Sequence, residues 1–471
     1  MPISKSILLN TDSYKVSMWQ QYPPKTSGVY SYIESRGGRY DQTVFFGLQA
    51  FIKEYLTKPI TQNDIDIADE ILTAHGEPFN REGWQYILNR HQGRLPVVIK
   101  AVREGTVVPI RNVLATIENT DPKCFWLTTW LETAILRAIW YPTTVATQSW
   151  TIRQIILGYL EETGDPSTID FKLHDFGARG VSSMESAGIG GAAHLVNFMG
   201  TDTITGMLYA REYYGGGVCG FSIPAAEHST ITSWGRDNEV DAYRNMLNKF
   251  AKPGSIVAVV SDSYDIYNAA EKLWGEELRE QVVKSGATVV IRPDSGDPEI
   301  VCRKLVQILH KKFGATKNSK GFYVLNNVRI IQGDGVNENT IKSILGSFKA
   351  YGYSADNIAF GMGGALLQQV DRDTQKFAMK CSAVKIDGEY EGEWSDVEKD
   401  PITDKGKKSK PGRVTLWNSG GEFVSSVDKP SGWYDKATGP FLEALVVVYK
   451  DGELKNSITF NEVRANAKNC A

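Results

Sequence analysis

The middle of the chain repeats one pattern of apolar and polar positions. The stretch Thr288–Asp297 (TVVIRPDSGD) is a short β-branched run that ends at Arg292 and Asp294, and a segment of helical periodicity (PEIVCRKLVQILHKKF) follows it. Such a run predicts a buried strand followed by a helix. Charged residues placed directly after the run lie at the carboxyl end of the strand, where α/β sheets hold their ligands.

The same pattern recurs on both sides of this stretch. Seven short runs end in polar or glycine residues that are 26 to 40 positions apart: Asp175, Asp202, His228, Asp262, Asp294, Asp334 and Gly363. This spacing matches the length of a βαβ unit. Seven units in a row predict an irregular TIM-like barrel of parallel strands, α/β in class, with these residues at one mouth.

The two ends of the chain have a different pattern. Pro96–Ile110 alternates apolar and polar positions around Gly105, as an antiparallel pair would, and Val29–Ile33 alternates like a strand. Two hairpin signals follow residue 412, at Asn418–Gly421 and Asp451–Gly452. Antiparallel character at both ends predicts one flanking mixed α+β domain whose sheet is built from both chain ends.

We therefore predict three ranges along the chain. Residues 1–150 form the first part of the flanking domain, 151–385 the catalytic barrel, and 386–471 the second part of the flanking domain. The segment 389–412 is polar and rich in lysine, which predicts a solvated loop.

Composition excludes several classes of partner. The 52 basic and 55 acidic residues nearly cancel, so neither a nucleic acid nor a membrane surface is expected to bind. The five cysteines are scattered and lack metal-binding spacing, which predicts reduced thiols. No apolar run approaches the ~18 residues of a membrane span, and the N-terminus has no signal-peptide pattern. We expect a soluble, cytoplasmic protein.

His228 is the first candidate for chemistry, because it lies at a predicted strand end beside Glu227. An imidazole held in one tautomer by a carboxylate is reactive near neutral pH. Asp262, Asp265 or Glu227 could supply that carboxylate. The alternative is an ordinary histidine at the barrel rim with its hydrogen bonds satisfied.

Arg292 and Asp294 are the second candidate, and an ordinary ion pair at the rim is the alternative reading. Further cations at or near strand ends favour a phosphate site instead, since arginine binds phosphate oxygens bidentately and glycines open backbone N–H groups to them. The cations are Arg179, Arg372 and Lys380, and the glycines are Gly333, Gly335, Gly361, Gly363 and Gly364. Neither GxGxxG nor GxxxxGK[ST] occurs, which disfavours the two common nucleotide-binding folds.

Phe176 and Asp202 share the predicted rim. Phe176 is more often a core residue at such a position. An aromatic ring next to an acid can also stack on a flat heterocycle and accept a hydrogen bond from its exocyclic N–H.

These motifs together resemble the nicotinamide phosphoribosyltransferases, of the type II phosphoribosyltransferase group. The resemblance covers nearly the whole chain and is carried by TDSYKVS from Thr11, QYPP from Gln21, LHDFGARGVSS from Leu173, HLVNFMGTDT from His194, PAAEHSTIT from Pro224, SDSYDIYNA from Ser261, IRPDSG from Ile291, IQGDGVN from Ile331 and AFGMGG from Ala359. The adjacent acidic pair of the type I diphosphate motif is absent.

The resemblance implies an activity and an assembly. A phosphoribosyl group would pass from 5-phosphoribosyl 1-diphosphate (PRPP) to the ring nitrogen of nicotinamide, with Mg²⁺ present, giving nicotinamide mononucleotide and diphosphate. Members are homodimers with shared active sites, and similar enzymes hydrolyse ATP through a phosphorylated histidine, which matches His228. A neutral pyridine nitrogen needs no general base, so we assign His228 to ATP coupling. The sequence does not assign ligands to the metal.

The resemblance also implies roles for single residues. The pyridine ring would stack between Phe176 and Tyr14 of the partner subunit, and Asp202 would accept from the carboxamide N–H. The phosphoribosyl and ATP site would be lined by Arg36, Arg179, Arg292, Asp294, Gly333, Asp334, Gly363, Gly364, Arg372, Lys380, Lys399 and Lys407.

Two features depart from vertebrate members of the family. Ala178 replaces an aromatic residue inside the DFG-x-RG motif, which predicts a thinner wall of the pocket. The segment SRGGRYDQTVF is short where those members insert residues, as in a prokaryotic or phage form.

Three other functions remain as alternatives. Nicotinate phosphoribosyltransferase has the same fold and mechanism, but a substrate carboxylate about 4 Å from Asp202 would meet a repulsion of roughly 4 kcal/mol, or roughly three decades in affinity. A non-catalytic binding homologue would be expected to lose the rim residues, which persist here. An aldolase-like barrel would need a Schiff-base lysine at a strand end, for which Lys380 is the candidate.

Overall fold

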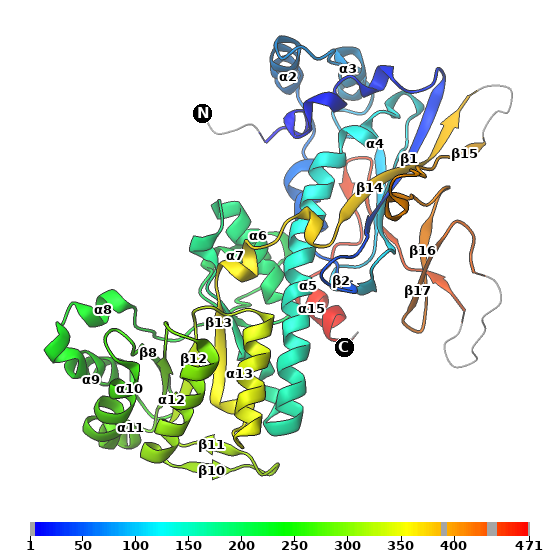
Figure 1. Ribbon diagram of the computed structural model, residues 1–471. Coiled ribbons are helices and arrows are strands. Elements are labelled where there is room, and N and C mark those ends of the chain that lie inside the picture. Colours follow the sequence, from blue (N-terminus) through cyan, green and yellow to red (C-terminus); the bar gives the residue numbers. More distant parts are fainter. Residues whose placement is uncertain (1–4, 388–392, 431–439, 470–471) are drawn as a thin grey trace. The chain divides into compact units, whose positions relative to one another are not determined.

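The computed structural model describes residues 5–387, 393–430 and 440–469 (Figure 1). Contacts divide the chain into two compact units. Unit 1 comprises Met1–Thr147, Ala210–Gly216 and Asp371–Ala471, so both ends of the chain belong to it. Unit 2 comprises Gln148–Tyr209 and Gly217–Val370.

Unit 2 is built on a six-stranded parallel sheet in the order β7-β6-β13-β12-β9-β8. Its strands are β6 (Leu173–Asp175), β7 (Gly200–Thr201), β8 (Ile256–Val260), β9 (Thr288–Arg292), β12 (Val328–Gln332) and β13 (Ile358–Met362). Each is a predicted apolar run, and each ends where the sequence pattern places it. Together with the separate antiparallel sheet of unit 1, this confirms the predicted fold class.

The seventh predicted run does not form a regular strand. Phe221 makes one parallel bridge to Gly200 of the edge strand β7, and Ala225 makes one to Ala258 of the other edge strand, β8. The intervening Pro224 has no N–H group, so a regular ladder cannot continue through it. The segment 221–226 therefore joins the two edges of the curled sheet, and the seven positions follow one another in chain order.

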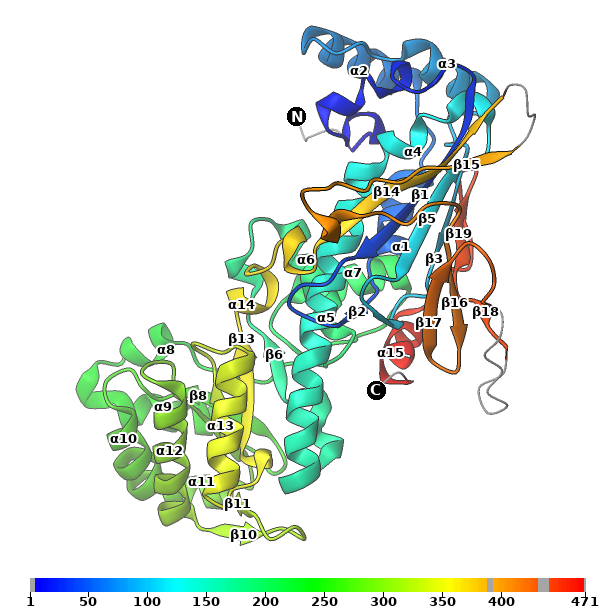
Figure 2. The ribbon, with the colours of Figure 1, turned by 45° about the vertical axis from the view of Figure 1, so that its right-hand side comes forward.

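Helices connect and cover these strands. The predicted amphipathic segment after Asp294 forms α12 (Pro298–Phe313), which begins at an Asp297 cap and packs against α13 (Glu338–Ala350) (Figure 2). The other helices assigned to unit 2 are α6 (Met184–Leu195), α8 (His228–Thr232), α9 (Glu239–Phe250), α10 (Ile266–Asn268), α11 (Arg279–Ser285) and α14 (Gly364–Leu367), together with most of α7 (Ile204–Tyr214). A small hairpin, β10 (Ala315–Lys317) and β11 (Tyr323–Leu325), completes the unit.

Unit 1 contains a seven-stranded sheet in the order β15-β14-β1-β5-β3-β19-β20. Its strands are β1 (Thr26–Ser35), β3 (Val97–Ala101), β5 (Val113–Asn119), β14 (Phe377–Ile386), β15 (Trp394–Asp396), β19 (Val446–Lys450) and β20 (Glu453–Leu454). Strands from both chain ends alternate within the sheet, and all its pairings are antiparallel. The predicted joining of the two ends into one sheet is thus confirmed.

One predicted pairing in unit 1 is wrong. The runs on either side of Gly105 do not pair with each other, because β3 pairs with β5 and β19 whereas β4 (Val107–Pro109) pairs with β2 (Gln42–Val44). Both predicted hairpins form, as β19–β20 and as β16 (Thr415–Ser419) with β17 (Glu422–Ser426), and β18 (Leu442–Glu443) extends the second.

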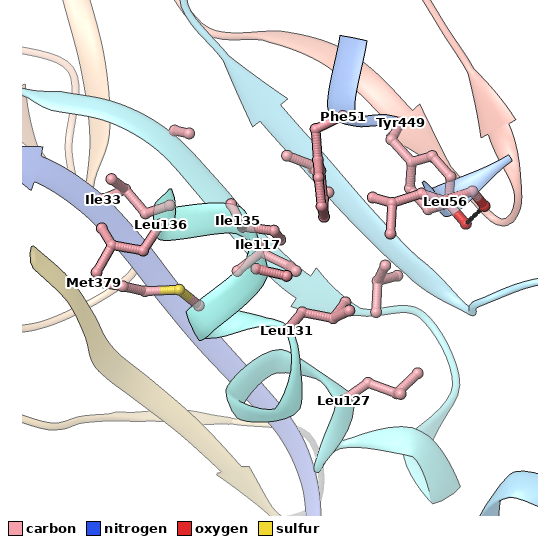
Figure 3. Packing of buried hydrophobic residues seen from close by; sticks show 14 of the residues in the cluster. Ile33, Phe51, Leu56, Ile117, Leu127, Leu131, Ile135, Leu136, Met379 and Tyr449 are labelled. Atoms are coloured by element: carbon pink, nitrogen blue, oxygen red, sulfur yellow. Dashed lines mark hydrogen bonds between the residues drawn. The ribbon is translucent and has the colours of Figure 1, made fainter. Parts of the chain in front are cut away.

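Helices of unit 1 pack their apolar side chains against the sheet. Figure 3 shows Leu127 of α4 (Leu127–Trp130) and Leu131, Ile135 and Leu136 next to Ile117 of β5. Tyr449 lies in the same cluster, where its hydroxyl donates to the carbonyl of Leu56 at 3.2 Å. The remaining helices of unit 1 are α1 (Leu48–Phe51), α2 (Gln62–Ala74), α3 (Arg81–Arg90) and α15 (Phe460–Asn469). The long α5 (Glu132–Thr163) belongs to unit 1 up to Thr147 and to unit 2 from Gln148.

Two whole-chain expectations concern membranes and thiols. Within the described ranges, no helix combines the length and the apolar composition that crossing a bilayer requires. Four cysteines in those ranges are free, namely Cys124, Cys219, Cys302 and Cys381.

Candidate active site

His228 opens α8 at the mouth of the parallel sheet, and a carboxylate fixes its ring. Its Nε2 lies 2.9 Å from Oδ1 of Asp262, and its Nδ1 lies 4.0 Å from Oδ2 of Asp294. Asp262 is in turn held by the backbone N–H of Asp294 at 3.0 Å and by the Ser295 hydroxyl at 2.5 Å. Of the three carboxylates that the sequence offered, Asp262 is the one that contacts this histidine.

The other two acids have different partners. Asp265 accepts the N–H groups of Tyr267 and Asn268 and so caps α10. Glu227 accepts from the hydroxyl of Ser229 at 2.9 Å at the start of α8. Both side chains therefore act in local capping contacts beside the histidine.

Arg292 and Asp294 end β9 side by side. Nη2 of Arg292 lies 3.4 Å from Oδ2 of Asp294, while its Nε is buried without a hydrogen-bond partner. Burial raises the pKa of the Asp294 carboxyl; the charges of Arg292 and His228 oppose this effect, and nearby Asp334 adds to it. A guanidinium with an unused donor next to a partly shielded carboxylate suits an anionic, polar substrate group.

Phe176 follows β6 directly, and its ring lies against the glycines of two neighbouring strand ends. A Cβ atom on Gly361 would lie only 1.9 Å from Cε2 of this ring, and one on Gly333 would lie 3.6 Å from the same atom and 2.9 Å from Oδ1 of Asp294. These glycines leave the space that the ring occupies. Phe176 is half-buried, so the ring is neither a core residue nor free in solution.

Asp202 follows β7, which is the neighbour of β6. The register pairs Asp175 with Thr201, so Phe176 and Asp202 are the next residues of two adjacent parallel strands. The carboxylate of Asp202 is exposed and accepts from the hydroxyl of Ser222 at 2.6 Å. Ser222 has no sequence signal of its own, because only the bridge at Phe221 brings it next to β7.

The turn after Phe176 lies against the turn after β13. The backbone at Gly177 and Gly180 approaches Gly363 and Gly364 so closely that a Cβ at Gly180 would lie 3.2 Å from Cα of Gly364. Arg179 is exposed within this turn. Unit 2 thus brings together the predicted residues of its own range: Phe176, Arg179, Asp202, His228, Asp262, Arg292, Asp294, Gly333, Asp334, Gly363 and Gly364.

A second group of predicted residues lies in unit 1. Lys380 is within β14 of the antiparallel sheet, so its sequence-based placement at the end of a barrel strand is wrong, since residues 377–386 pair with β1. Burial lowers the pKa of the Lys380 ammonium, and Arg36, Lys399 and Arg372 lower it further. The carboxylate of Glu132 acts in the opposite direction and raises this pKa. The three cations near Lys380 would favour a phosphate-rich ligand.

Of the other predicted residues of unit 1, Tyr14 and Lys407 lie at its surface, whereas Arg36 is partly buried. The ring of Tyr14 is 59% exposed, with the ammonium of Lys15 4.9 Å from its centroid. Lys407 lies at the surface too, 3.4 Å from Oδ2 of Asp404. Arg36 contacts Oε1 of Glu34 at 3.3 Å and buries an Nη2 without a partner.

The described side chains include one group that could hold a metal ion. Three donors from His, Cys, Asp or Glu converge in one place there, at His91, Asp121 and Cys124 of unit 1. The carboxylates of Asp262 and Asp294 form no such group. They fit Mg²⁺ in another way, because this ion usually keeps several waters and binds one or two carboxylates together with substrate phosphates.

The carboxyl ends of the parallel strands thus carry an oriented histidine, a glycine-backed aromatic ring and an arginine beside a carboxylate. These groups suit an enzyme that binds a flat ring and a phosphate group. Comparison with known proteins agrees. Residues 171–453 match the nicotinate phosphoribosyltransferase (NAPRTase) family, and residues 6–99 match the N-terminal domain of nicotinamide phosphoribosyltransferase.

Relatives extend this match over the whole chain. The nicotinamide phosphoribosyltransferase of Xanthomonas campestris pv. campestris (strain 8004) is 57% identical over 98% of both chains, and that of Acinetobacter baylyi is 31% identical over 96% of this chain and 95% of its own. The crystal structure of a nicotinate-nucleotide pyrophosphorylase from Pyrococcus furiosus shares the fold, with a TM-score of 0.65, 16% identity and coverage of 100% and 96% of the two chains. The chain belongs to the NAPRTase family, among the relatives known as nicotinamide phosphoribosyltransferases.

Proposed function

We propose that this enzyme transfers the phosphoribosyl group of PRPP to the ring nitrogen of nicotinamide, giving nicotinamide mononucleotide and diphosphate for NAD biosynthesis. The observation that carries the proposal is that Phe176 and Asp202 are the residues directly after the paired strand ends Asp175 and Thr201. It provides a flat apolar surface beside a carboxylate that can accept from a carboxamide N–H.

The transfer breaks the bond from C1 of the ribose to the diphosphate and forms a bond from C1 to the pyridine nitrogen. Positive charge develops on the ribose, and the carboxylate of Asp294 would stabilise it. The guanidinium of Arg292, with its unused Nε–H, would bind a phosphate oxygen. No proton leaves the attacking nitrogen, so no general base is required.

Mg²⁺ belongs to this proposal as the ion that neutralises the diphosphate of PRPP. Asp262, Asp294 and Asp334 each offer one carboxylate at the mouth, which suits an ion bound chiefly through substrate oxygens. Chelation of the ion is expected to abolish the transfer.

ATP coupling through His228 is the second part of the proposal. Because Nε2 faces Asp262 at 2.9 Å, the tautomer with a proton on Nε2 leaves the Nδ1 lone pair free to attack. The γ-phosphoryl group would move from ATP to Nδ1 with departure of ADP, and water would later release phosphate. The unit 1 cations Arg36, Lys380 and Lys399 are proposed to bind phosphates of the substrates.

Nicotinamide is preferred to nicotinate in this proposal because of Asp202. The carboxylate of Asp202 is exposed, so water weakens its repulsion of the nicotinate carboxylate. Two such charges 4 Å apart repel by about 1 kcal/mol in water and by about 4 kcal/mol at an effective dielectric of 20. We expect a preference between about fivefold and a thousandfold.

A homodimer with shared active sites is the third part. Helices α6 and α7 pack together through Gly191 and Gly206, and their outer faces expose Met184, Ile204 and Leu208 at 72%, 65% and 56%. Exposed apolar side chains on these two helices favour burial against a second copy. The exposed Tyr14 would then complete a site in that copy. A cytoplasmic location suits the free thiols.

The test is a product assay with purified protein, PRPP and Mg²⁺, offering nicotinamide and nicotinate in competition, with and without ATP. Nicotinamide mononucleotide as the main product is the expected result, and ATP is expected to stimulate its formation. Nicotinate mononucleotide would overturn the substrate assignment, whereas absence of both products would favour a non-catalytic binding protein.

Sharing of sites has its own test, in which Tyr14→Ala and Asp202→Ala proteins are dissociated, mixed and reassociated. A mixed dimer would have one site with both residues intact, so an equal mixture is expected to recover about a quarter of wild-type activity. Unchanged low activity, together with a monomeric mass by light scattering, would contradict the shared site.

A further inference from the structure

Asp175 is a buried acid at the end of β6, directly before Phe176 and next to β7, which Asp202 follows. It is the last residue of β6 and is fully shielded from solvent. Its register partners are Met362 of β13 on one side and Thr201 of β7 on the other. No charged side chain forms an ion pair with it in the described part of the chain.

Two hydrogen bonds connect Asp175 to the groups proposed to hold nicotinamide. Its Oδ1 accepts the N–H of Gly177 at 2.7 Å, which fixes the turn that begins with Phe176. Its main-chain carbonyl accepts the N–H of Asp202 at 2.9 Å. The turn that begins with Phe176 and the backbone of Asp202 are therefore both hydrogen-bonded to Asp175.

Burial of the second carboxylate oxygen of Asp175 lowers the stability of the folded protein. Oδ2 is buried without a hydrogen-bond partner, and so is the hydroxyl of nearby Thr203. Burial and the charge of Asp202 raise the pKa of Asp175, and Gly177 and Thr203 lower it, so that it is about 6; burial also lowers the pKa of neighbouring His174. A neutral side chain would fill this position at lower cost.

We propose that Asp175 is a positioning residue for nicotinamide: its carboxylate and its carbonyl hold Phe176 and Asp202 at the separation that accepts the ring and the carboxamide together. A hydrogen bond to an ionised acceptor is roughly twice as strong as one to a neutral acceptor, so ionised Asp175 orders the Gly177 turn most firmly. This inference rests on the proposed function, which the wild-type assay tests separately.

The experiment measures KM for nicotinamide, KM for PRPP and kcat in three variants. Asp175→Ala removes the acceptor for Gly177, and we expect KM for nicotinamide to rise about tenfold or more while KM for PRPP stays within about twofold. Asp175→Asn keeps an acceptor and is expected to recover most of the affinity. Asp165→Ala is the matched control, because Asp165 makes the same kind of bond, to the N–H of Ser167 at 2.9 Å, before β6 begins.

A pH series gives a readout that a purely structural role would not change. In the wild type, KM for nicotinamide is expected to rise as the pH falls from 7.5 to 5.5, whereas Asp175→Asn is expected to show a flat profile over that range. This comparison also serves if Asp175→Ala does not fold. An unchanged KM in folded Asp175→Ala, or the same pH dependence in Asp175→Asn as in the wild type, would overturn the proposal.

Discussion

Replacement of Asp175 by asparagine should make the protein's stability less sensitive to pH. In the folded protein burial raises the pKa of this carboxyl from its ordinary 3.8 to about 6, whereas in the unfolded chain it stays near 3.8. The folded state therefore binds a proton more tightly than the unfolded state does. Below pH 3.8 the acid is mostly protonated in both states and costs little; above about pH 6 it is mostly charged in both, and only the folded state buries the charge.

The size of this effect follows from the two pKa values. The difference between 3.8 and about 6, at 1.36 kcal/mol per pH unit, corresponds to about 3 kcal/mol of stability that the wild type loses as the pH rises from 4 to 7. Asp175→Asn does not titrate in this range, so it lacks that loss. Its Nδ2 would be buried near Thr203, which adds a change of stability that does not vary with pH.

The assay is urea unfolding of both proteins at several pH values between 4.5 and 7.5. The free energy of unfolding of Asp175→Asn minus that of the wild type should increase by about 2 to 3 kcal/mol across this range. Subtraction at each pH removes the contributions of all other titrating groups. A difference that stays constant with pH would refute the reasoning, because it would mean that Asp175 is not a buried titrating acid.

Three further changes test the site. Asp202→Asn should relax the preference for nicotinamide over nicotinate, measured as the ratio of the two kcat/KM values; an unchanged ratio would show that another group sets it. His228→Ala should lose ATP stimulation and the incorporation of phosphate from labelled ATP while keeping the ATP-independent transfer, and full stimulation in this variant would contradict the phosphohistidine. Gly361→Ala should displace the ring of Phe176, raising KM for nicotinamide at least tenfold, because its Cβ would lie 1.9 Å from that ring. Gly158→Ala is the control, since no atom lies within 4 Å of a Cβ there and alanine should stabilise the helix by about 0.5–1 kcal/mol.

The sequence predicted the parallel strands well, because each is a short β-branched run followed by a polar residue, and both signals are local. Thr288–Arg292 and Val328–Gln332 are examples. Partners of strands were harder to predict, since pairing depends on segments far apart in the chain. The run before Gly105 pairs with residues 113–119 and 446–450. The run after Gly105 is nearer in sequence, but it pairs with residues 42–44.

Among the site residues, those with a local sequence signal were predicted and those positioned by distant segments were not. His228, Arg292 and Asp294 were found because they directly follow apolar runs. Ser222 was not, because it reaches Asp202 only through the bridge at Phe221. Nor did composition indicate that Asp175 is buried, since a single acid within a polar stretch is usually solvated.

The segment 221–226 separates from its neighbours in the barrel more easily than the regular strands do. It is held to its neighbours at only two bridges, so separating it breaks fewer backbone hydrogen bonds than separating any of the five-residue strands would. We expect its amides to exchange with solvent ahead of those of β8 and β9. Ser222, which donates to Asp202, lies near one end of this segment, and His228 follows its other end. Local opening of residues 221–226 would therefore disturb the proposed base pocket and His228 at the same time.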